Sequence, residues 1–114
     1  MTVLFADIVG FTGLAEHTDP EQVKNLVDRC FERLAADIAD HGGRVDKILG
    51  DALVAFFGAP TAHEDDAERA VRAGLRMLRT LEAWRDDAGV ADLRMRVGVN
   101  TGEVLVGSLR AAGD

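Results

Sequence analysis

Two aspartates far apart in the sequence are each presented at a turn of the chain. Asp7 ends an apolar, β-rich run and is followed three residues later by Gly10, and Asp51 follows Gly50 between two further β-rich runs. Carboxylates hold Mg²⁺ together with waters and the phosphates of a substrate, so one or two of them can suffice. If folding brings these two side chains together, they can hold a pair of divalent cations on a nucleoside triphosphate.

The residues around Asp7 predict a strand and two helices. Thr2–Ala6 predicts a central strand that ends at Asp7, and a short helix is expected from about Gly10 to His17. A second helix begins after Asp19, with Pro at its first position and Gln where a capping box needs it, and it stops at Gly42-Gly43. Its apolar residues follow at spacings of three and four: Val23, Leu26, Val27, Cys30, Leu34 and Ile38.

The residues around Asp51 predict a hairpin. Arg44–Leu49 mixes polar and apolar residues, Ala52–Phe57 is nearly all apolar, and Gly50-Asp51 between them is a two-residue turn signal.

The second half of the chain predicts a helix and two strands. The helix runs from about His63 to Trp84 and is closed by Gly89, with the acidic residues 64–66 as a solvated cluster at its start. Its apolar face is expected to consist of Val71, Leu75, Leu78 and Leu81. Leu93–Asn100 and Glu103–Leu109 predict strands around a turn at Thr101-Gly102. The order β-α-α-β-β-α-β-β predicts an α+β fold, a ferredoxin-like sandwich with helices on one face of an antiparallel-rich sheet.

Composition narrows the class of protein. The length of 114 residues fits one domain over residues 1–114. The formal net charge of −7 argues against a nucleic-acid partner. Its apolar runs fall well below the roughly 18 residues of a membrane span. Strand pattern begins at Val3, so no leader peptide is expected and we predict a cytoplasmic location. The single cysteine, Cys30, is predicted to be a core residue.

Four motifs together resemble one family, the class III adenylate/guanylate cyclase catalytic domain of the bacterial type. The resemblance runs from residue 3 to about residue 109 and is carried by Phe5–Thr12, Lys47–Asp51, Phe57–Pro60 and Arg96–Gly102. It implies a signalling enzyme that converts ATP into 3′,5′-cyclic AMP and pyrophosphate with two Mg²⁺ or Mn²⁺ ions per site. Asp7 and Asp51 match the catalytic metal-holding aspartates, and the carbonyl of Ile8 matches a backbone metal ligand.

The resemblance also implies how the nucleotide is bound. The backbone of Val9, Gly10, Phe11 and Thr12 matches the phosphate-binding segment, and Arg96 matches an arginine on the terminal phosphates. Lys47 matches the purine reader, where lysine accompanies adenine and glutamate accompanies guanine. The family works as a head-to-tail homodimer with shared sites, so Lys47 of one protomer is expected to serve the aspartates of the other.

The resemblance stops short of the family's C-terminal segment. That segment carries a second purine contact and an Asn-x-x-x-Arg pair on the α-phosphate. Asn25 and Arg29 have this spacing, but they lie in the second predicted helix, on the wrong element, so we interpret the match as a coincidence. We therefore expect residues 1–114 to be the major N-terminal part of the catalytic domain, with little or no activity alone.

Structural roles and other functions stay open. Asp7 can cap a helix and Asp51 can be an ordinary hairpin residue. Lys47 can be a solvated strand lysine, and Arg96 can pair with surface acids. The chain as a whole can be a non-catalytic cyclase-fold module for regulation or dimerisation. A guanylyl or diguanylate cyclase-like enzyme is a further alternative, although the hairpin lacks the Gly-Gly-acidic turn of diguanylate cyclases.

Overall fold

Antiparallel strands and two long helices make up the described fold. The structure, a computed structural model, describes residues 1–10, 13, 16, 18–58, 62–90 and 92–102. Its elements in chain order are β1 (Thr2–Val9), α2 (Pro20–Asp40), β2 (Arg44–Leu49), β3 (Ala52–Phe57), α3 (Asp66–Ala88) and β4 (Arg94–Thr101). The helix expected at 10–17 lies largely outside the described residues, and the strand expected at 103–109 lies wholly outside them.

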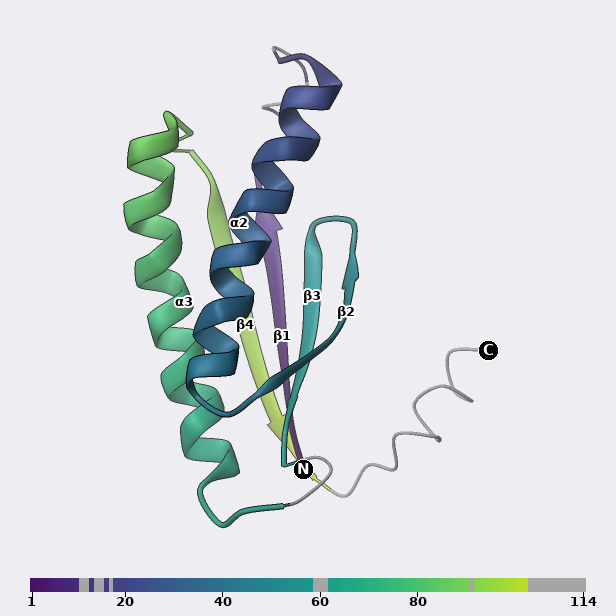
Figure 1. The fold of residues 1–114 in the computed structure, drawn as a ribbon, viewed down its shortest axis with the longest axis vertical. Helices are drawn as coiled ribbons and strands as arrows, with labels where there is room; N and C mark the ends of the chain where they lie inside the picture. Colours follow the sequence, from purple (N-terminus) through teal and green to yellow (C-terminus); the bar gives the residue numbers. More distant parts are fainter. Residues whose placement is uncertain (11–12, 14–15, 17, 59–61, 91, 103–114) are drawn as a thin grey trace.

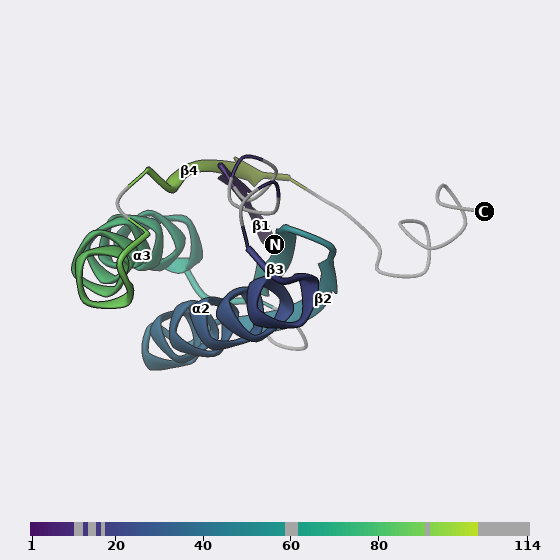
Figure 2. The same cartoon turned by 90° about the horizontal axis from the view of Figure 1, so that it is seen from above.

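The strands form one antiparallel sheet in the order β2-β3-β1-β4. Both helices lie against the same face of this sheet, and within the described residues no helix covers the opposite face (Figure 2). We call that opposite face the open face. The carboxyl end of β1, the β2–β3 turn and the start of α2 all lie at one end of the molecule (Figure 1). This arrangement confirms the predicted α+β sandwich.

Helix α2 begins and packs as its sequence predicts. The Asp19 side chain accepts a hydrogen bond from the Glu21 N–H at 3.3 Å, and Pro20 occupies the first turn. Cys30, Leu34 and Ile38 are buried against the sheet. The capping residues and the apolar spacing therefore fixed both the start and the phase of this helix.

Helix α3 buries a different face from the predicted one. Val71, Leu75 and Leu78 are exposed, at 49%, 57% and 39%. Of the four residues predicted for the buried face only Leu81 is buried, and the observed face consists of Ala70, Ala73, Gly74, Met77, Leu81 and Trp84. The physical reason is close approach to the sheet, because a Cβ added at Gly74 would lie only 3.1 Å from a methyl group of Val97.

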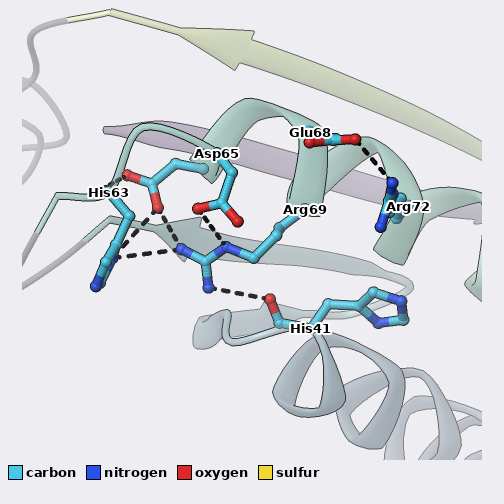
Figure 3. A network of polar contacts seen from close by, with 7 residues as sticks. His41, His63, Asp65, Glu68, Arg69 and Arg72 are labelled. Carbon is cyan, nitrogen blue, oxygen red and sulfur yellow. Dashed lines mark hydrogen bonds and ion pairs between the residues drawn. The ribbon is translucent and has the colours of Figure 1, made fainter.

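The sequence predicted that the acidic cluster at the start of α3 is solvated, but this is wrong for one of its residues. Asp66 is buried, accepts a hydrogen bond from the His63 N–H at 2.8 Å and forms an ion pair with Arg69. Arg69 also lies 3.3 Å from the Asp65 carboxylate and donates to the His41 carbonyl at 3.3 Å (Figure 3). This network ties the end of α2 to the start of α3.

Strand β4 has the predicted length but begins and ends one residue later than predicted. It includes Thr101, whose hydroxyl lies 2.8 Å from that of Thr2, and the Gly102 N–H donates to the Met1 carbonyl at 3.1 Å. The described chain thus keeps pairing with β1 where the sequence predicted a turn.

Candidate active site

Alternation along β1 decides which residues face the open side of the sheet. Leu4, Ala6 and Ile8 are buried beneath the helices, whereas Phe5 and Asp7 are exposed. Successive side chains of a strand point to opposite faces, so Asp7 belongs to the open face. Its position near the end of β1 places its carboxylate beside the turns of neighbouring elements.

Asp51 is brought next to β1 by a backbone hydrogen bond. The Ile8 N–H donates to the Asp51 carbonyl at 2.9 Å, so the residue directly after Asp7 is held against Asp51. Both aspartates are exposed, and neither side chain forms a hydrogen bond or ion pair with another described residue. Gly50 has a φ of 62°, as expected for the predicted tight turn. Two free carboxylates therefore lie at the same end of the sheet.

Arg96 and Lys47 lie on the open face as well. Arg96 is the direct partner of Asp7 in the β1–β4 ladder, and it is exposed. Lys47 pairs with Val54 of β3, and Val54 pairs with Phe5 of β1. Phe5 lies two residues before Asp7, on the same face of the sheet. Cross-strand partners share a face of the sheet, so the side chains of both basic residues belong to the open face.

The described part of the segment after Asp7 consists of an exposed residue followed by a glycine with positive φ. Val9 is 39% exposed, and Gly10 has a φ of 113°, a conformation that side chains rarely adopt. A Cβ at Gly10 would also lie 3.2 Å from the Asp92 carbonyl oxygen. Phe11 and Thr12, which complete the predicted segment, lie outside the described residues.

A hollow of about 510 Å³ on the open face joins several of these residues. Asp7 and Arg96 line it together with Phe5, Val54 and Gly98. Phe5 and Gly98 were not predicted as site residues, because they meet only through the strand register that pairs them directly. Gly98 has no close neighbour that demands a glycine, so its effect here is to leave space.

A second cleft, of about 490 Å³, lies between α2 and α3 on the other side of the molecule. It is lined by charged residues of both signs, such as Arg33 and Asp87, around the edge of Trp84. The hollow on the open face is the better candidate for the active site, because it combines the carboxylate of Asp7 with the guanidinium of Arg96, and neither group forms an ion pair with another described residue.

The donor set fits a divalent cation that keeps much of its hydration. Among the described residues no group of three or more His, Cys, Asp or Glu side chains could form a full protein cage. Mg²⁺ does not require one, since it usually retains several waters and binds one or two carboxylates plus substrate phosphates. Asp7 and Asp51 meet that smaller requirement.

Comparison with known proteins identifies the family. The sequence model of the adenylate and guanylate cyclase catalytic domain matches residues 1–112. The chain belongs to this family, as the four motifs had predicted.

Relatives and solved structures agree with this assignment. The chain is 33% identical over 114 residues to adenylate cyclase 1 of Rhizobium meliloti, covering 97% of this chain and 17% of that protein. The crystal structure of the adenylyl cyclase CyaB from P. aeruginosa matches with a TM-score of 0.82 and 33% identity, covering 89% of this chain and 55% of that one. A crystal structure of a guanylyl cyclase matches with a TM-score of 0.81 and 38% identity, covering 89% and 53%.

These similarities do not show whether the substrate is ATP or GTP, because the solved adenylyl and guanylyl cyclases match about equally well. The chain spans only about half the length of the solved cyclase chains and less than a quarter of the curated adenylate cyclases it matches. None of the described helices is long and apolar enough to cross a membrane.

Proposed function

We propose that this domain forms 3′,5′-cyclic AMP and pyrophosphate from ATP, with two Mg²⁺ or Mn²⁺ ions held by Asp7 and Asp51. The observation that carries the proposal is the hydrogen bond from the Ile8 N–H to the Asp51 carbonyl, which brings the two unpaired aspartates to one end of the sheet. In this assignment the Ile8 carbonyl is a further metal ligand.

The reaction transfers the α-phosphate between two oxygens of one molecule. The ribose 3′-hydroxyl loses its proton to water and its oxygen bonds to the α-phosphorus, while the bond from that phosphorus to the bridging oxygen breaks and pyrophosphate leaves. Bound divalent ions supply charge neutralisation and lower the pKa of the attacking hydroxyl. The protein's own share is to position the nucleotide, with Arg96 on the terminal phosphates and the backbone N–H groups of residues 9–12 around the phosphate chain.

The preference for adenine rests on Lys47. A protonated amine is a donor without acceptor capacity, so it suits the ring nitrogen that accepts a hydrogen bond in adenine and carries a hydrogen in guanine. Lys47 lies on the open face with its side chain 52% exposed, which leaves it available to a ligand.

We further propose a head-to-tail homodimer in which Lys47 of one protomer serves the aspartates of its partner. The uncovered apolar side chains of the open face support an association through this surface, since Phe5 is 49% exposed and Leu49 is 60% exposed. The chain spans about half the length of the solved cyclase chains, so the remaining stabilisers of the α-phosphate would come from the part of the domain that it does not cover, and residues 1–114 alone would be a weak or inactive catalyst. We place the domain in the cytoplasm, where ATP is available.

The decisive experiment measures cyclic AMP formed from Mn-ATP by the domain extended with its natural downstream residues. Asp51→Ala should abolish turnover and metal-dependent nucleotide binding. The matched control is Asp40→Ala, because Asp40 is an exposed aspartate with no ion pair among the described residues. A protein that forms no cyclic AMP, and whose nucleotide affinity is the same with and without Asp51, would rule the proposal out. Continued dimerisation in that case would favour a non-catalytic module.

A further inference from the structure

Strand β2 contains an irregularity directly before Lys47. Val45 pairs with Ala55 and Lys47 pairs with Val54, so the neighbouring residues Ala55 and Val54 are matched by residues two apart on β2. Asp46 is therefore the extra residue of a β-bulge and has no partner on β3. Bulges of this kind often lie beside functional sites, where they re-aim a side chain.

The bulge allows two adjacent side chains to meet. In a regular strand, neighbours point to opposite faces, which would separate Asp46 from Lys47. Here the Asp46 carboxylate lies 4.0 Å from the Lys47 ammonium. Among the described residues it is the only acid within ion-pair distance of Lys47. Asp46 is also the less exposed partner, with 35% of its side chain accessible against 52% for Lys47.

The bulge also reconciles two demands on β2. Val45 packs against the core beneath the helices, as does its partner Ala55, whereas Lys47 shares the open face with Val54. With the tight turn at Gly50-Asp51 fixing the register from one end, one extra residue lets both orientations coexist in a short strand.

We infer that Asp46 is a positioning residue for Lys47 and thereby helps to select adenine over guanine. This inference rests on the proposed function of Lys47 as the purine reader. A lysine side chain has four flexible carbons and does not hold one orientation unaided. The carboxylate beside it restricts the ammonium to the open face, and it supplies a counter-charge when a base displaces water from that ammonium.

The expected effect is on nucleotide binding rather than on the chemical step. Exposed ion pairs contribute little, so Asp46→Asn should raise KM for ATP about threefold and leave kcat within about twofold. The ratio of kcat/KM for ATP to that for GTP should fall by a similar factor. Asp46→Glu, which retains the charge, should recover most of the loss.

The test compares Asp46→Asn, Asp46→Glu and Lys47→Ala, singly and combined, in the extended domain with Mn-ATP and Mn-GTP. Asp40→Asn is the control for the loss of one exposed negative charge. If Asp46 acts through Lys47, Asp46→Asn should have no further effect on the ATP-to-GTP ratio in the Lys47→Ala background.

The outcomes separate the two claims. A ratio that changes with Lys47→Ala but not with Asp46→Asn overturns the role of Asp46 and leaves the proposed function intact. A ratio that is unchanged by Lys47→Ala overturns the purine assignment itself, and the role of Asp46 with it. Equal effects of Asp46→Asn with and without Lys47 show that the aspartate acts through the backbone alone, which also overturns the inference.

Discussion

Asp7 of β1 and Arg96 of β4 are direct partners across an antiparallel ladder, yet their side chains form no ion pair with each other or with any other described residue. Opposite charges at such positions commonly attract each other and contribute roughly 0.2–1 kcal/mol. Here both groups stay free beside the same hollow. A carboxylate and a guanidinium left available in this way suit a metal–phosphate ligand, which needs both.

Replacing Arg96 should therefore weaken nucleotide binding without weakening the fold. A hydrogen bond to a charged group contributes about 1.5–3 kcal/mol, so Arg96→Ala should lower the affinity for a non-hydrolysable ATP analogue with Mn²⁺ about tenfold to a hundredfold. Isothermal titration calorimetry measures this change, and the urea midpoint should stay constant. Arg79→Ala, at an exposed arginine of α3 with no ion pair among the described residues, is the control. Equal affinities for the two variants would contradict the assignment.

Asp66 should make stability depend on pH in the acid range. The hydrogen bond from the His63 N–H lowers the pKa of its carboxyl below 3.8, Arg69 lowers it further, and burial opposes both. A carboxyl whose pKa is lower in the folded state stabilises the fold fully above its unfolded value. That contribution is lost as pH falls through the lower folded value.

Urea denaturation at pH 6.5 and at pH 3 measures this contribution. Asp66→Asn should lower the unfolding free energy at pH 6.5 by about 1–3 kcal/mol, and the difference from wild type should shrink at pH 3. Asp65→Asn should change little, because its side chain is 57% exposed. A gap between Asp66→Asn and wild type that is the same at both pH values would contradict this explanation.

Cys30 should be nearly inert towards thiol reagents while the protein is folded. Burial raises the pKa of its thiol to about 11, and the thiolate is the reactive form. At pH 8 only about one thiol in a thousand would be ionised in the folded protein. Reaction with Ellman's reagent, followed by absorbance, should be slow in buffer and fast in urea. Equal rates in the two conditions would show that Cys30 is accessible.

The sequence predicted the elements better than it predicted their contacts. Asp19 and Pro20 set the start of α2 through local chemistry, and the β2–β3 turn followed from Gly50-Asp51 for the same reason. The pairing of Asp7 with Arg96 depends on the register of strands almost ninety residues apart, which no local pattern encodes. The bulge at Asp46 was not predicted, although the two consecutive polar residues Asp46 and Lys47 interrupt the alternation of this strand.

The buried face of α3 shows why hydrophobicity can mislead about packing. Leucine and valine spacing pointed to Val71, Leu75 and Leu78, yet the sheet is close enough to select Ala73 and Gly74 instead. The burial of Asp66 at the start of the same helix was not predicted either. An aspartate among other acids is expected to be solvated, and its partners His63 and Arg69 are known only from the structure.

The reversed face of α3 gives a direct stability prediction. Met77 is fully buried in the core and Leu75 is 57% exposed, although both belong to the middle of the same helix. Met77→Ala removes buried atoms and leaves a cavity, so it should lower the unfolding free energy by about 2–5 kcal/mol. Leu75→Ala removes mainly solvated atoms and alanine is the better helix former, so its effect should stay within about 0.5 kcal/mol.

Urea denaturation followed by circular dichroism compares the two variants under one condition. The ratio of the two effects is the informative quantity, because both substitutions shorten a side chain to alanine in the same helix. If Leu75→Ala proved as destabilising as Met77→Ala, the face predicted from the apolar spacing would be the buried one after all. The phase that the structure gives to α3 would then be wrong, and with it the packing of Gly74 against Val97.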